Sequence, residues 1–152
     1  MSGWGVNGIG TFQSGTPLPL TDAVNLTNSF GGGSRPNSTG KSAQLSGSAQ
    51  SRLSEWFNTS AFTAPPAFTF GNLARTLPDV RGPGIDNYDF AVFKNTTLTE
   101  RLGLQFRTEV FNIFNRVQFS PPGLSLGTAQ FGLISGQYNT PRLIQFALRL
   151  SF

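Results

Sequence analysis

Few side chains in this sequence have the chemistry that catalysis requires. The chain contains no His and no Cys, which removes the commonest general base and metal ligand together with every thiolate. Glu109 is a possible catalytic acid, but no second carboxylate lies in its segment, and a charge pair with Arg107 is the better interpretation. We therefore expect no enzymatic activity, no catalytic residue and no cofactor.

Two further stretches resemble ligand sites only superficially. "STGKS" suggests a phosphate-binding loop, but that motif needs a Gly five positions before Gly40, where this chain has Arg35. Asp79, Asp86 and Asp89 suggest a Ca²⁺ site, but their spacing does not fit an EF-hand loop. Hydrogen bonding at loop and strand ends explains these acids better, and we expect no metal site.

The composition disfavours a soluble nucleic-acid-binding protein. Only 12% of the residues are charged, and the formal net charge is +4. The Arg residues are scattered singly, so no basic stripe could follow a phosphate backbone. No apolar stretch approaches the roughly 18 residues of a transmembrane helix, and "MSGWGVNGIG" has neither a basic nor an apolar signal-peptide region. We expect no nucleic-acid partner and no signal peptide in this chain.

Alternation of apolar and polar residues predicts four strands, at about 3–14, 87–98, 102–115 and 142–152. In the last segment one face is entirely apolar, and it consists of Ile144, Phe146, Leu148, Leu150 and Phe152. Polar residues occupy the opposite face of the last two segments, namely Gln105, Arg107, Glu109, Gln145 and Arg149. Such strands either bury the apolar face in a core or turn it toward lipid.

The connections between these strands run long, short and long. Residues 15–86 and 116–141 are long and rich in Gly, Ser, Pro, Thr and Asn, whereas only "TER" separates the second and third strands. Short turns on one side and long loops on the other are typical of outer-membrane β-barrels. We therefore predict an all-β fold with about four antiparallel strands of such a barrel and two long extracellular loops. The 15–87 connection should be the most mobile or least regular region.

The barrel interpretation assigns a direction to each face. The apolar face would contact lipid, and the polar face with Arg107, Glu109 and Arg149 would line the lumen, because an Arg facing lipid near the midplane costs about 2–4 kcal/mol. Trp4 and Tyr88 are either interfacial girdle residues or ordinary strand aromatics.

Four stretches together resemble the C-terminal end of TonB-dependent receptor-like outer-membrane proteins with a carboxypeptidase-regulatory-like domain. They are "RGPG", the "FK" pair, "LQFRTEVFNIFN" and "PRLIQFALRLSF", supported upstream by "GIGTFQSGTPL" and "EWFNTSAF". The resemblance covers nearly the whole chain. It implies outer-membrane localisation, contact with membrane lipid and uptake of an unidentified ligand.

The same resemblance implies partners. The C-terminal strand ending in Phe152 is similar to the insertion signal that the barrel assembly machinery reads. Full members of the family have a plug and a barrel of 22 strands, so this chain is expected to be a fragment that does not transport alone. Its partners would then be the remainder of the parent barrel and plug.

A different class of function stays open at this point. The chain could be a secreted antiparallel β binding module that grips a carbohydrate or a protein and has no transport role. That alternative requires the apolar faces to pack on one another, and for sugar binding it requires loop tryptophans, of which only Trp56 is available.

Overall fold

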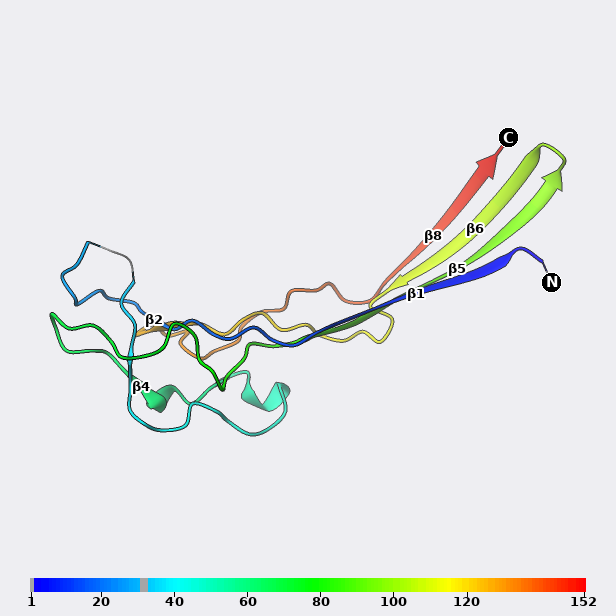
Figure 1. Ribbon diagram of the computed structural model, residues 1–152. Coiled ribbons are helices and arrows are strands. Elements are labelled where there is room, and N and C mark those ends of the chain that lie inside the picture. Colours follow the sequence, from blue (N-terminus) through cyan, green and yellow to red (C-terminus); the bar gives the residue numbers. More distant parts are fainter. Residues whose placement is uncertain (1, 31–32) are drawn as a thin grey trace. The chain divides into compact units, whose positions relative to one another are not determined.

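A four-stranded antiparallel sheet forms the regular part of the molecule. The computed structural model describes residues 2–30 and 33–152. The strands are β1 (Trp4–Gln13), β5 (Ile85–Thr99), β6 (Leu102–Phe111) and β8 (Leu143–Ser151), in the spatial order β1-β5-β6-β8 (Figure 1). The prediction of an all-β fold with about four antiparallel strands is confirmed. The sheet is open, with β1 and β8 at its two edges.

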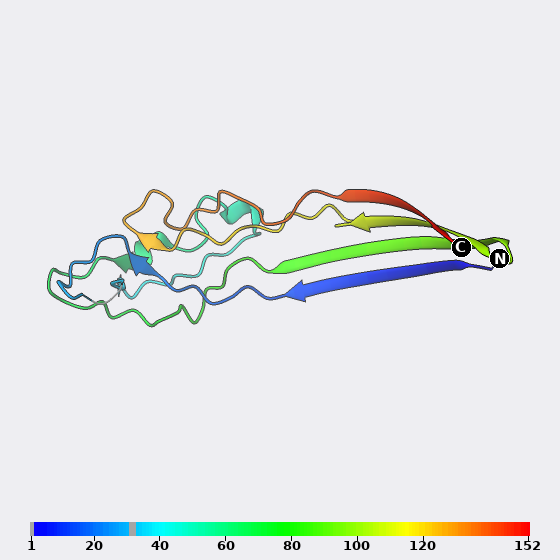
Figure 2. The same cartoon turned by 90° about the horizontal axis from the view of Figure 1, so that it is seen from above.

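The strand register places the two long connections at one end of the sheet. Gln13 lies opposite Ile85, and Phe111 lies opposite Leu143, so residues 14–84 and 112–142 both leave from this end. At the other end Thr99 pairs with Leu102 across a tight turn, and β1 begins and β8 ends there (Figure 2). The connections therefore alternate between long and short in the manner of an outer-membrane barrel.

Strand β6 is shorter than its alternation pattern suggested. The pattern extends over 102–115, but β6 ends at Phe111. Asn112 and Asn115 both have a φ of 51°, in the left-handed region that Asn tolerates better than most residues. These two residues turn the chain out of the sheet, although the apolar residues between them continue the strand-like sequence.

The two long connections together form a second compact unit, which we call the loop unit. It comprises Ser14–Gly84 and Phe119–Gln137. β2 (Thr21–Asp22) pairs in parallel with β7 (Ser125–Leu126), and β3 (Asn37–Ser38) pairs with β4 (Phe62–Thr63). Two single 3₁₀ turns, η1 (Gln50–Arg52) and η2 (Thr59–Ala61), complete its regular structure. Most of the unit is irregular, as expected for its composition.

The loop unit nevertheless has a packed core. Phe57 is 0% exposed, and its ring makes edge-to-face contacts with Phe62 at 5.8 Å and with Phe131 at 5.2 Å between centroids. The indole Nε1 of Trp56 donates a 2.7 Å hydrogen bond to the Arg81 carbonyl. The buried cluster contains Leu18, Leu20, Trp56, Phe57, Ala61, Phe62, Leu77, Val80 and Ile134. The sequence pattern does not reveal this core, because its residues are spread over both connections among many polar ones.

Candidate functional site: the two faces of the sheet

One face of the sheet is apolar across all four strands. Register rows on this face run from Val6 through Val92 and Thr108 to Phe146, and neighbouring rows end in Ile144, Leu148 and Leu150. The Phe106 and Phe146 rings stack across β6 and β8 with their centroids 6.2 Å apart. The hydrophobic residues singled out in the C-terminal strand thus join one continuous apolar surface. Phe152 lies just beyond the end of β8.

Nothing among the described residues covers this surface. Phe146 is 67% exposed and Leu148 is 70% exposed, and every residue of β8 is exposed. A water-soluble sheet would bury such a face against a core. The secreted-module alternative needed the apolar faces to pack on one another, and in this structure they do not.

The opposite face carries the five polar residues singled out in the sequence. Gln105 lies opposite Arg149, and Glu109 lies opposite Gln145. Arg107 forms an ion pair with Glu109, with 2.7 Å between Nη2 and Oε1. The Gln105 side chain donates a 2.8 Å hydrogen bond to Asn95 on the neighbouring strand. The structure therefore brings these five residues together on one face, where Arg107 and Glu109 pair their charges.

An aromatic residue and a cation meet on the apolar face where β1 begins. Lys94 lies opposite Trp4, with its ammonium 5.2 Å from the indole centroid. The same ammonium donates a 2.7 Å hydrogen bond to the Ser2 carbonyl. The aromatic ring attracts the ammonium, and a Lys side chain can lay its aliphatic stem along apolar surface while its charge reaches a polar group.

A second aromatic cluster lies on the apolar face at the loop end of the sheet. Tyr88 packs edge-to-face against Phe12 and Phe114, in each case with 5.1 Å between centroids. The Arg116 guanidinium lies 5.6 Å from the Phe114 centroid. Trp4 and Phe12 are eight residues apart, which is about 26 Å along a strand and about 20 Å after a barrel-like tilt. This separation is of the same order as the ~25 Å apolar height of outer-membrane barrels.

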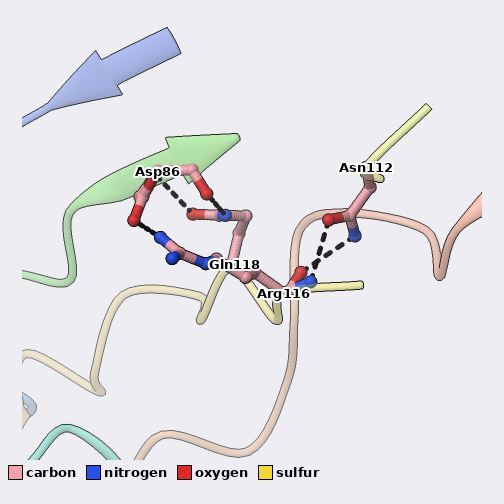
Figure 3. A network of polar contacts seen from close by, with 4 residues as sticks. All are labelled: Asp86, Asn112, Arg116 and Gln118. Atoms are coloured by element: carbon pink, nitrogen blue, oxygen red, sulfur yellow. Dashed lines mark hydrogen bonds and ion pairs between the residues drawn. The ribbon is translucent and has the colours of Figure 1, made fainter. Parts of the chain in front are cut away.

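A polar network closes the loop end of β5 and β6 (Figure 3). Asp86 forms an ion pair with Arg116, and Gln118 binds the Asp86 backbone twice, accepting from its N–H at 3.2 Å and donating to its carbonyl at 2.8 Å. The buried Asn112 side chain accepts from the Arg116 N–H at 2.8 Å and donates to the Arg116 carbonyl at 2.9 Å. This network fixes the chain where it leaves the sheet.

Sequence reasoning missed most of this network. Of the three acids for which the sequence predicts hydrogen bonding at loop and strand ends (Asp79, Asp86 and Asp89), Asp89 accepts a 2.9 Å hydrogen bond from the Asn112 N–H, and Asp86 pairs with Arg116. Asn112 and Gln118 gave no signal, because uncharged amides in a polar loop look alike until the fold buries some of them. Both are less than 10% exposed.

Asp22 in the loop unit has an unusual environment. Burial raises the pKa of its carboxyl above 3.8, an effect that the neighbouring Ser34 hydroxyl partly opposes. Both carboxylate oxygens are shielded from solvent, and the Ser34 hydroxyl is the hydrogen-bonding group beside them. Sequence reasoning did not single out this residue.

Residues 2–30 and 33–152 contain no group of three or more His, Cys, Asp or Glu side chains arranged to hold a metal ion. The same residues contain no helix that is long and apolar enough to cross a membrane.

The comparisons with known proteins agree with this geometry. A family model described as an outer membrane beta barrel domain matches residues 1–145. No curated protein and no solved structure matches the chain. Because the family match spans nearly the whole chain, the chain belongs to the outer membrane beta barrel domain family. It is an outer-membrane protein, and its four strands belong to a membrane barrel.

Proposed function

We propose that this chain forms the C-terminal part of the barrel of a TonB-dependent receptor-like protein that takes up a ligand across the outer membrane. The observation that carries the proposal is the continuous apolar face of four strands, backed by a face of polar residues that includes the Arg107–Glu109 ion pair. The long connections at a single end of the sheet and the resemblance of "LQFRTEVFNIFN" and "PRLIQFALRLSF" to that receptor branch support it further.

The open sheet determines what the chain needs in order to work. In lipid every backbone donor and acceptor must be paired within protein, so spanning strands must belong to a closed sheet. β1 and β8 each leave one edge unpaired, and four strands are fewer than the eight of the smallest bacterial outer-membrane barrels. The strands and plug of a parent receptor would close this sheet, and the chain alone would not transport.

The C-terminal residue offers a test of the assembly role. Deletion of Phe152 in the parent context should lower the amount of assembled barrel, because the amphipathic strand β8 would pair less well with the edge of the assembly machinery. Heat-modifiable mobility of outer-membrane fractions measures the assembled amount. Ligand affinity per assembled molecule should stay the same. Unchanged membrane levels after the deletion would contradict an insertion role.

Transport requires its own experiment. Spent medium from cells with the intact and the deleted parent gene is compared by mass spectrometry, each with and without a protonophore. TonB-dependent uptake predicts at least one solute that only energised cells with the intact gene deplete. A normally assembled barrel with no gene-dependent or energy-dependent depletion would reject the transport function and leave the barrel itself in place.

A further inference from the structure

One charge on the apolar face of the sheet has no counter-charge among the described residues. Of the described strand residues on this face, only Asp86 and Lys94 are charged. Asp86 forms an ion pair with Arg116, whereas Lys94 forms none with any described residue. A cation on a lipid-facing surface is costly, so an unpaired one indicates a function and a partner that supplies negative charge.

The Lys94 side chain points toward the end of the sheet that carries the tight turn, which we call the turn end. Its ammonium donates a 2.7 Å hydrogen bond to the Ser2 carbonyl. β1 runs away from the turn end, so Ser2 lies nearer that end than Trp4, the residue opposite Lys94 (Figure 2). The Asn95 N–H donates to the Gly3 carbonyl at 2.7 Å, so the pairing with β5 continues to this point. The ammonium thus reaches away from the centre of the apolar face.

This direction brings the ammonium toward the membrane boundary. Measured from the aromatic cluster around Phe12, an apolar band of ~25 Å extends about ten residues along a tilted strand. Trp4 is eight residues from Phe12, so Lys94 opposite it lies about two residues inside the far limit of this band. A Lys stem covers such a distance, and it can lie along apolar surface while its charge reaches the headgroup layer.

Hydrogen-bond donors around Lys94 lack acceptors. The ammonium has three N–H donors and uses one of them for the Ser2 carbonyl. The indole of Trp4, whose centroid is 5.2 Å from the ammonium, is 60% exposed, and its N–H forms no hydrogen bond with a described residue. The hydroxyl of Thr96, two positions from Lys94 on the same face, forms none either. This part of the apolar face therefore offers a positive charge and several donors to an external acceptor.

An anionic group attached to apolar chains suits these surroundings best. Phe106 and Leu148 share a register row with Lys94 and are 43% and 70% exposed, so apolar surface adjoins the cation. A phospholipid phosphate supplies negative charge and several acceptor oxygens, and its acyl chains cover such a surface. A free phosphate ion would leave the apolar surface uncovered. Because the site is continuous with the lipid-facing surface of the barrel, lipid is the molecule that reaches it.

We propose that Lys94, Trp4 and Thr96 bind the phosphate of a phospholipid in the leaflet at the turn end of the sheet. The ammonium donates to the phosphate oxygens, and the indole N–H and the threonine hydroxyl add hydrogen bonds. The acyl chains lie on Phe106 and Leu148. The proposal rests on the membrane barrel and goes beyond ligand uptake, so it stands whether or not the parent protein transports a ligand.

Native mass spectrometry of the full chain, released from dodecyl maltoside detergent micelles, tests the site. The probes are dioleoylphosphatidylglycerol, dioleoylglycerol, which has the same acyl chains without the phosphate, and glycerol 3-phosphate, which has the phosphate without the chains. At equal concentration, phosphatidylglycerol should bind at least about fivefold more than either other probe. Equal binding of dioleoylglycerol would show apolar contact alone, and equal binding of glycerol 3-phosphate would show a site for a free anion. Either result would overturn the proposal.

Matched variants assign the binding to Lys94. Lys94→Gln should reduce phosphatidylglycerol binding at least about fivefold, whereas Lys94→Arg keeps the charge and should stay within about twofold of the native chain. Arg101→Gln makes the same charge change in the tight turn at the same end of the sheet and should bind normally. No binding by the native chain, or equal losses in Lys94→Gln and Arg101→Gln, would refute the lipid site. A Lys94-dependent dimer without bound phosphatidylglycerol would assign the charge to a protein contact and would refute it as well.

Thr96→Val removes the hydroxyl at nearly constant shape and should weaken phosphatidylglycerol binding about two- to threefold. Thr97→Val, on the opposite face of β5, is its control and should leave binding unchanged. Lys94→Gln should leave the unfolding midpoint of the sheet unchanged or higher, because it removes a charge from a lipid-facing surface. A lower midpoint with unchanged lipid binding would assign Lys94 a structural role through its hydrogen bond to Ser2 and would contradict its place in the site.

Discussion

Asn112 decides where strand β6 ends. It is 6% exposed, it has a φ of 51°, and its side chain makes two hydrogen bonds with the Arg116 backbone. Asn112 therefore stabilises the fold in two ways, through its left-handed backbone conformation and through its side-chain hydrogen bonds. Two different substitutions should separate these two contributions to the free energy of unfolding.

We expect Asn112→Ala to lower the free energy of unfolding by about 2–3 kcal/mol, because Ala loses the hydrogen bonds and disfavours the left-handed conformation. Asn112→Gly should cost about 1 kcal/mol less, since Gly adopts a positive φ without strain. Urea unfolding of the micellar chain measures both values. Equal losses in the two variants would show that the backbone conformation contributes nothing.

Asp22 provides the pH-dependent prediction at this scale. Burial raises its pKa in the folded state above 3.8, so folding favours the protonated carboxyl relative to the unfolded chain. The carboxyl therefore contributes stability at low pH, and that contribution is lost as the pH rises through the raised pKa. Asp22→Asn should stabilise the loop unit at pH 7, by less than about 1 kcal/mol because solvent screens the group in part.

The gain in stability of the loop unit from Asp22→Asn should become smaller as the pH falls toward 3.8. Urea titrations followed by Trp56 fluorescence, in a Trp4→Phe background, report on the loop unit at each pH. A constant difference between Asp22→Asn and the parent from pH 3 to pH 7 would contradict the raised pKa.

At the scale of elements, the alternation of side chains along each strand decides which residues lie on the apolar face and which on the polar face. Phe146 lies in a register row with Thr108 on the apolar face, whereas its neighbour Gln145 lies opposite Glu109 on the polar face. The two residues are at nearly the same depth in the sheet, so they offer a comparison in which only the direction of the side chain differs.

We expect Phe146→Arg to reduce outer-membrane assembly in the parent context strongly, because an Arg on the lipid face near the midplane costs about 2–4 kcal/mol. Gln145→Arg places the same group on the polar face, opposite Glu109, so it should assemble at near-normal levels. Heat-modifiability of membrane fractions measures both variants. Equal assembly of the two would argue against a lipid-facing apolar surface.

At the scale of the whole molecule, two compact units alternate along the chain. The sheet strands come from the beginning, the middle and the end of the sequence, and the loop unit comes from the two segments between them. Within the loop unit, Trp56 donates its backbone N–H to the Gly132 carbonyl at 2.8 Å, and Phe57 packs on Phe131. The two connections therefore fold as one body.

Because the two connections fold as one body, a substitution in one of them should destabilise both. Phe57→Ala should destabilise the loop unit by about 3–5 kcal/mol, because it removes a fully buried ring. Hydrogen exchange should accelerate in both Ser14–Gly84 and Phe119–Gln137 and remain unchanged in β5 and β6. Phe68→Ala, which removes an exposed ring, is the control. Faster exchange in the first segment alone would show that the two connections fold independently.

The sequence by itself determined the strands, their alternation and the polarity of their faces. A period of two residues follows from strand geometry, so the positions of Phe146, Leu148, Arg107 and Glu109 on opposite faces needed no tertiary information. The lengths of the connections likewise indicated a barrel segment, because the alternation of long loops and short turns is a property of the chain alone. The early end of β6 was not visible, because the left-handed conformation of Asn112 depends on its burial and its hydrogen-bond partners.

Only the tertiary structure decided what the long connections do. Their buried residues are separated by many polar ones, so no periodic pattern marks the core around Phe57. The hydrogen bond from Trp56 to Gly132 joins residues about 75 positions apart, and the network of Asp86, Arg116 and Gln118 joins residues about thirty apart. Contacts of this kind depend on loop closure and packing rather than on local periodicity, and a single sequence carries no local signal for them.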